Sequence, residues 1–125
     1  DAEFDIDSVH TLPRVDIAYA YAGADGLLVR ALVEAGVAGI VAGGLGSGGS
    51  PSKMMAALKT ATQSGIPVVI ATQTGNGRVV RTRRYDEDGY IVADNLSPKK
   101  TRILLMLALT KTKDPEEIQR MMLTY

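Results

Sequence analysis

Short apolar runs alternate along this chain with segments of helical periodicity, and no other feature constrains its fold as strongly. Residues 39–42 and 67–71 are apolar throughout, which is the pattern of strands covered on both faces of a parallel sheet. Residues 15–19 alternate well enough to form a strand before them. Helical crossovers of about a dozen residues separate these strands, and parallel neighbours need connections of that length. The order predicts an α/β fold.

The expected helices have recognisable ends. Apolar side chains recur at helical spacing over residues 24–35, and Gly36 follows where a helix usually ends in a left-handed residue. A second helix begins near Ser52 and ends at Gly65. After a fourth strand at residues 90–93, two more helices have N-cap signals, which are Ser97 before Pro98 and Asp114 with Glu117 at capping-box spacing.

Composition fits one domain with a substantial core, because 46% of the 125 residues are hydrophobic. We expect a three-layer open sheet of about four mostly parallel strands and about four helices, Rossmann-like or flavodoxin-like, over residues 13–125. Residues 1–12 are polar and irregular and are interpreted as an inter-domain linker. The chain begins with Asp1 and has no signal peptide, so we interpret it as a processed or excised piece.

Several function classes are disfavoured by the same composition. Fourteen basic and fourteen acidic residues balance, so no global field recruits nucleic acid or an anionic membrane, and no apolar run is long enough to span one. The chain has no cysteine, and no second histidine or carboxylate lies at ligand spacing from its one histidine, His10. We therefore expect no metal and no Ser-His-Asp triad, and interpret His10 as structural or exposed.

The glycine-rich stretch at residues 43–51 is the first place to look for a ligand. Open parallel sheets bind ligands at the carboxyl ends of their strands, so residues 21–25, 43–50 and 72–77 should form one rim. Glycines there allow a ligand to approach the backbone, or they only permit a tight turn. No Gly-Lys-Ser/Thr follows, and the resemblance of 44–49 to a dinucleotide fingerprint is weak because no ribose-binding acid stands about twenty residues on.

Two other stretches carry expectations. Residues 78–89 are highly charged and are interpreted as a loop that is solvated and partly self-compensating, although such a loop can also close over a site. Residues 103–109 are apolar all round, which a surface helix cannot bury by itself. We expect a second surface there, either another subunit or a missing domain.

Four segments together resemble the carboxyl-terminal domain of bacterial-type L-asparaginases. They are Phe4-Asp5 with Leu12-Pro-Arg-Val-Asp-Ile17, Ala31-Leu-Val-Glu-Ala-Gly36 with Gly39-Ile-Val41, Asp94-Asn-Leu-Ser-Pro-Lys-Lys-Thr-Arg-Ile-Leu-Leu105, and the tail from Ala108 to Gln119 with Tyr125. The tail is similar to the secreted, type II branch. The likeness extends over essentially the whole chain.

This resemblance implies a two-domain amidohydrolase that converts L-asparagine, and often L-glutamine, into the acid and ammonia without a cofactor. It places the nucleophilic threonine in an amino-terminal domain that this chain lacks, so the chain alone should be inactive. It also implies a dimer or homotetramer in which this domain completes the neighbouring subunit's active site, in the periplasm or secreted, with a cytoplasmic location still open.

The resemblance further implies which residues contact substrate. One group that this domain supplies to the neighbouring subunit's site is usually an Asn or Ser, at the position that matches Gly49 here. Because Gly49 has no side chain, Ser47 or Ser50 would have to substitute for it. The candidate substrate-binding residues of the turn are Ser47, Gly48, Gly49 and Ser50. The other group is often a glutamate, whose negative charge pairs with the ammonium group of the substrate. Arg84 or Tyr85 occupies the matching position here. Asp86 or Glu87 could replace it, whereas an arginine would oppose an ammonium group.

Two other functions stay open at this point. The chain could be a non-catalytic module that dimerises through residues 103–109. It could instead be a small-molecule or phosphate-binding domain that uses the glycine-rich turn. An upstream domain with Thr-Gly-Gly-Thr-like and Gly-Thr-Asp-Thr-like motifs would favour the enzyme.

Overall fold

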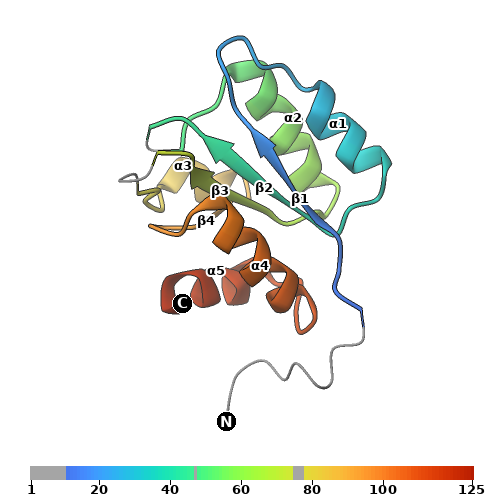
Figure 1. Cartoon of the computed structure of the whole chain (residues 1–125), viewed down its shortest axis with the longest axis vertical. Helices are drawn as coiled ribbons and strands as arrows, with labels where there is room; N and C mark the ends of the chain where they lie inside the picture. Colours follow the sequence, from blue (N-terminus) through green and yellow to red (C-terminus); the bar gives the residue numbers. More distant parts are fainter. Residues whose placement is uncertain (1–10, 47, 75–77) are drawn as a thin grey trace.

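The computed structural model describes residues 11–46, 48–74 and 78–125, which form four strands and five helices (Figure 1). In chain order these elements are β1 (Val15–Tyr19), α1 (Leu27–Glu34), β2 (Gly39–Gly44), α2 (Ser52–Gln63), β3 (Val68–Thr72), α3 (Arg83–Glu87), β4 (Ile91–Val92), α4 (Pro98–Leu109) and α5 (Pro115–Thr124). The four predicted strands are confirmed. His10 and most of the predicted linker lie outside the described residues.

All strands pair in parallel in one sheet of order β1-β2-β3-β4. Val15 is opposite Gly39, Ile40 is opposite Val68, and Val69 is opposite Ile91. This confirms the α/β class and the parallel sheet. The order does not confirm the Rossmann-like label, because strands in Rossmann and flavodoxin sheets reverse their order at a switch point and these run consecutively.

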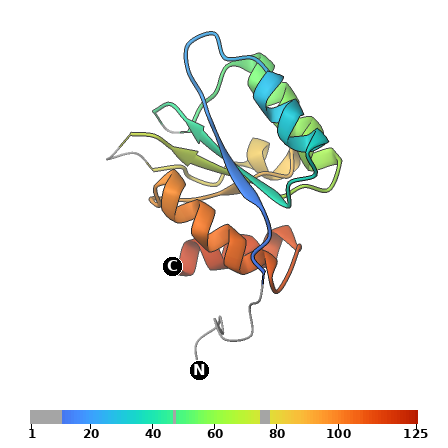
Figure 2. The ribbon, with the colours of Figure 1, turned by 45° about the vertical axis from the view of Figure 1, so that its right-hand side comes forward.

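Helices cover both faces of the sheet, which gives the predicted three layers (Figure 2). Helices α1 and α2 pack on one face, over a core that includes Ile40, Leu58 and Ile70. Helices α4 and α5 pack on the other, over a core that includes Val41 and Leu105. Alternate residues of each strand therefore enter separate cores, which is why the central strands are apolar throughout.

The described residues form five helices where about four were expected, and the additional one is α3 in the charged stretch. Thr82 starts this helix, since its side chain accepts a hydrogen bond from the N–H of Tyr85. The charged side chains also pair with one another, as expected, through Arg81 with Asp86 and Arg83 with Glu87. A five-residue helix with no fully buried side chain leaves no apolar period in the sequence.

The two N-caps predicted for the last helices are confirmed. Ser97 accepts from the N–H of Lys100, and Asp114 accepts from the N–H of Glu116. The predicted capping box does not form in the expected way. The N–H of Asp114, which Glu117 would have accepted, donates instead to Thr112 Oγ1 at 2.9 Å.

Helix α4 is covered on two sides within this chain, because it packs on the sheet and against α5. Leu104, Leu105 and Ala108 are buried in this way. Ile103 remains 54% exposed. The sheet and α5 together therefore cover most of the apolar stretch at 103–109, and Ile103 is its most exposed side chain.

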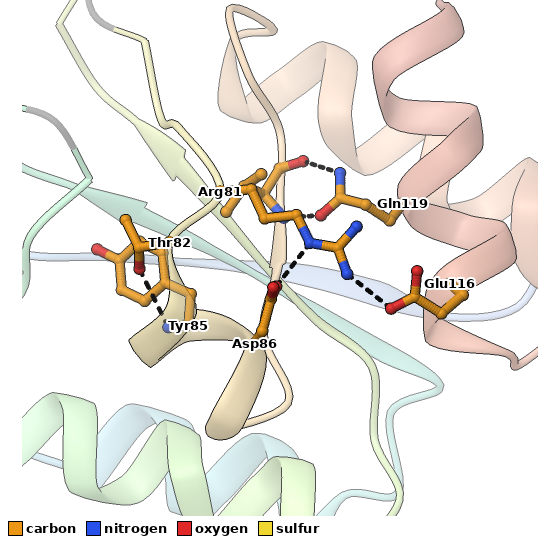
Figure 3. A network of polar contacts seen from close by, with 7 residues as sticks. Arg81, Thr82, Tyr85, Asp86, Glu116 and Gln119 are labelled. Atoms are coloured by element: carbon orange, nitrogen blue, oxygen red, sulfur yellow. Dashed lines mark hydrogen bonds and ion pairs between the residues drawn. The ribbon is translucent and has the colours of Figure 1, made fainter.

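The side chain of Gln119 in α5 pairs with the backbone of β4, the edge strand of the sheet (Figure 3). Its Nε2 donates to the carbonyl of Val92 and its Oε1 accepts from the N–H of Val92, both at 2.9 Å. Gln119 is 3% exposed. One amide thus replaces the pairing that a further strand would give, at a site that water does not reach.

We predict that Gln119→Leu lowers the free energy of unfolding by about 2 to 4 kcal/mol, because both backbone groups of Val92 lose a buried partner. The urea midpoint of unfolding measures this change. Gln63→Leu is the matched control, since Gln63 is exposed near the end of α2 and its replacement should change stability by less than about 0.5 kcal/mol. Equal midpoints for the two variants would refute the role of Gln119.

Candidate functional site

The loops that follow β1, β2 and β3 are joined at the carboxyl edge of the sheet by Gln73. Its Nε2 donates to the carbonyls of Ala20 and Gly43, each at 2.7 Å, and its backbone N–H donates to the carbonyl of Gly44 at 2.9 Å. Figure 2 shows the loops after β2 and β3 projecting from the same edge. Two of the three stretches predicted to form the rim, 43–50 and 72–77, are thus bonded to each other, and Gln73 also reaches Ala20, directly before the third.

The glycine-rich turn closes on itself directly after β2. The N–H of Leu45 donates to the carbonyl of Gly49 at 2.7 Å, and the N–H of Gly49 donates back to Leu45 at 2.9 Å. Gly46 and Gly48 have φ of 54° and 105°, in the region that favours glycine. A Cβ at Gly44 would lie 2.1 Å from the carbonyl oxygen of Gly48. These glycines are required by the turn itself.

Gly49 differs from its neighbours in the turn. A Cβ there would meet nothing closer than the carbonyl oxygen of Leu45 at 3.9 Å, and Gly49 does not have a positive φ. The position therefore has room for a side chain. Gly49 and Ser50 both border the adjacent cleft, whereas Ser47 lies outside the described residues.

A cleft of about 610 Å³ lies between this turn, α2 and α3. Gly49 and Ser50 border it from the turn, Arg84, Tyr85 and Asp88 come from the α3 segment, and the remaining lining residues are Ser52, Met55, Ala56, Lys59, Thr82 and Tyr90. Its volume is in the range of small-molecule sites. The turn and the charged segment thus form one concave surface.

Polar groups in the cleft are unevenly paired. Lys59 Nζ lies 3.5 Å from Asp88 Oδ1, whereas the side chain of Arg84 has no ion pair or hydrogen bond within the described ranges. Ser50 Oγ is buried and likewise has no hydrogen-bond partner in that part of the chain. Helix α2 begins after Pro51 without a side-chain cap. The Arg84 side chain can therefore bind a ligand without breaking an existing bond, and Ser50 Oγ has no bond to lose if it turns toward the cleft that Ser50 lines.

Tyr90 gives the cleft a neutral wall. Burial, with smaller contributions from Asp88 and Tyr85, raises the pKa of Tyr90 to about 12. Its hydroxyl donates to the carbonyl of Met55 at 3.1 Å, and its ring packs edge to face against Tyr85 at 5.9 Å. Tyr90 therefore stays protonated near neutral pH and holds α2 and α3 at their positions around the cleft.

The structure does not bring Asp86 or Glu87 to the cleft. Asp86 accepts from Arg81 at 2.6 Å, and Arg81 also pairs with Glu116 of α5 at 2.6 Å (Figure 3). Glu87 pairs with Arg83 at 3.1 Å. Neither carboxylate lines the surface shared by Gly49 and Ser50. Substrate binding by Asp86 or Glu87 stays a prediction.

The acid that lines the cleft is Asp88, which sequence reasoning did not select. The signal was helical spacing: Arg84 and Asp88 are four residues apart and share one face, while Arg83 and Glu87 share the next. Interpreting residues 78–89 as a loop removed that information.

No group of three His, Cys, Asp or Glu side chains that could hold a metal occurs within the described ranges. No helix there is long and apolar enough to cross a membrane.

Comparison with known proteins gives consistent matches. The chain matches the glutaminase/asparaginase C-terminal domain family over residues 14–122. A glutaminase-asparaginase of Pseudomonas fluorescens biotype A is 40% identical over 128 residues, which cover 100% of this chain and 35% of that protein. L-asparaginase 2 of Escherichia coli K12 is 39% identical over 127 residues, covering 100% of this chain and 36% of that protein.

A solved structure supports the same relationship. The crystal structure of a probable cytoplasmic L-asparaginase from Campylobacter jejuni matches with a TM-score of 0.94 at 39% identity, covering 99% of this chain and 41% of that one. The chain spans about a third of the length of the curated relatives it matches, at 35% and 36%. The resemblance to the carboxyl-terminal domain of type II L-asparaginases is thereby confirmed, and this chain belongs to the glutaminase/asparaginase C-terminal domain family.

Proposed function

We propose that this chain is the substrate-positioning part of an amidohydrolase that converts L-asparagine, and to some extent L-glutamine, into the acid and ammonia. The observation that carries the proposal is the match over the whole chain to relatives named L-asparaginase and glutaminase-asparaginase, of which it spans about a third. The remaining two thirds would be the amino-terminal domain that supplies the nucleophile. By itself, the chain would have no activity.

The proposed chemistry divides between the two parts. A threonine hydroxyl of the amino-terminal domain attacks the carboxamide, ammonia leaves, and water hydrolyses the acyl-enzyme without a cofactor. The cleft bordered by Gly49 and Ser50 holds the rest of the substrate so that its carbonyl meets the nucleophile. Its location at the carboxyl edge of a parallel sheet agrees with where such folds bind ligands.

We also propose that the domain forms part of a dimer or tetramer and completes a neighbouring subunit's site. Several large apolar side chains remain exposed in support of this, among them Tyr21, Leu27 and Leu28, which border a second cavity of about 250 Å³. Ile103 of α4 is a further exposed apolar residue. A periplasmic or secreted location is proposed from the type II tail alone.

We predict that the 125-residue chain releases no ammonia from asparagine or glutamine, and that a mixture with a separately expressed amino-terminal domain does. The physical reason is that positioning without a nucleophile cannot lower the barrier of amide hydrolysis. A coupled ammonia assay gives the rates, and the amino-terminal domain alone is the control. If the two domains are folded and associated but their mixture releases no ammonia, the result would favour the non-catalytic dimerising module.

We predict opposite effects for two glycines of the turn. Gly49→Ser fits the open space at that position and should raise kcat/KM for asparagine about fivefold in the assembled enzyme, through a hydrogen bond worth about 1 kcal/mol. Gly44→Ala places a Cβ against the Gly48 carbonyl and should cost about 2 kcal/mol or more in stability. Steady-state kinetics and thermal unfolding measure the two effects. A destabilised Gly49→Ser protein would contradict the assigned geometry.

A further inference from the structure

We propose that Arg84 and Ser50 make the cleft a carboxylate-binding site, and that in the assembled enzyme this site takes the α-carboxylate of the substrate rather than its ammonium group. The second half of this inference rests on the proposed function. The first half concerns the chain alone and is tested on it.

The charge of the cleft favours an anion. Three of its lining residues are charged, namely Lys59, Arg84 and Asp88. Asp88 is matched by Lys59 at 3.5 Å, which leaves the guanidinium of Arg84 without a carboxylate in the described part of the chain. A bound ammonium group would add a second uncompensated positive charge, whereas a carboxylate would neutralise the one present.

The neutral groups of the cleft add donors. Ser50 Oγ is buried and has no partner among the described residues, and a hydroxyl can donate to a carboxylate oxygen. It stands two residues before α2, whose first turn has free backbone N–H groups and no side-chain cap. An ammonium group has only donors, so it could use Ser50 as an acceptor but could not use the N–H groups.

The shape of the Arg84 guanidinium favours a carboxylate over a phosphate as the bound anion. A guanidinium offers two parallel N–H groups that match the two oxygens of a planar carboxylate. Among the described residues, Arg84 is the one unpaired cation that lines the cleft, whereas a phosphate dianion carries about two charges at neutral pH. Its volume of about 610 Å³ accommodates a small amino acid.

The neighbouring arginine is a natural control. Arg83 belongs to the same short helix, but its side chain is 93% exposed and pairs with Glu87 at 3.1 Å. It does not line the cleft. Any effect of Arg84→Gln that Arg83→Gln reproduces would therefore come from net charge and not from the site.

The first experiment follows the ¹⁵N-labelled 125-residue chain by NMR while succinate is added, in parallel with phosphate and with 1,4-diaminobutane. We expect saturable shifts at residues 49–52 and 84–88 with succinate, weakening at least tenfold in Arg84→Gln, a few-fold in Ser50→Ala, and not at all in Arg83→Gln. Equal weakening in both arginine variants would overturn the site. So would tighter binding of phosphate or of the diamine. Dispersed spectra of each variant exclude unfolding as the cause.

The second experiment uses the chain assembled with its amino-terminal domain and three amides. Succinamate lacks the ammonium group of asparagine, and 3-aminopropanamide lacks the carboxylate. In Arg84→Gln we expect the preference in kcat/KM for asparagine over 3-aminopropanamide to fall about tenfold, with the preference over succinamate unchanged. The reverse pattern would overturn the assignment of the α-carboxylate. If no amide is hydrolysed while the chain still binds succinate, the proposed function fails and the carboxylate site stands.

Discussion

Burial of β2 on both faces is the constraint on which the rest of this structure depends. Every residue of Gly39–Gly44 is buried, with β1 and β3 paired at its sides and a helical layer on each face. A strand in this position must be apolar, and its backbone can satisfy its hydrogen bonds only through parallel neighbours. Its carboxyl end then delivers the glycine-rich turn to one fixed place, beside the start of α2. The turn therefore lies beside α2 and α3, where its residues Gly49 and Ser50 border the cleft.

Much of this could be read from the sequence because local physics and global fold agree there. The apolar runs of β2 and β3 are typical of strands that are covered on both faces. The start of α4 is fixed locally, because Ser97 accepts a hydrogen bond from the N–H of Lys100, only three residues further along the chain. Helix α3 escaped prediction because it has no apolar period, so its charges had the same appearance as a solvated loop. The strand order was equally out of reach, since consecutive and reversed parallel sheets use the same strand and helix patterns.

The site was predictable only in part for a related reason. A turn residue such as Ser50 is placed by the strand before it, so its sequence position nearly determines its location. By contrast, each charged residue of α3 is placed by the direction of its side chain, and adjacent positions on a helix point about 100° apart. Asp86 therefore turns to Arg81 and α5, while Arg84 turns to the cleft. Gln73 and Gln119 were missed because their partners are backbone groups distant in sequence.

Helix α3 raises the question of what holds it firmly enough to define a cleft wall. Its ion pairs are exposed, and such pairs are worth only about 0 to 1 kcal/mol each. Tyr85 is the stronger anchor, because it packs on the core beneath α1 and α2 and meets Tyr90, which is itself hydrogen-bonded to α2. Arg81 adds a weaker link, because it pairs both with Asp86 of this helix and with Glu116 of α5. Packing therefore places α3 beside the cleft, and the helical spacing of its charges decides that Arg84 borders the cleft while Arg83 pairs with Glu87 outside it.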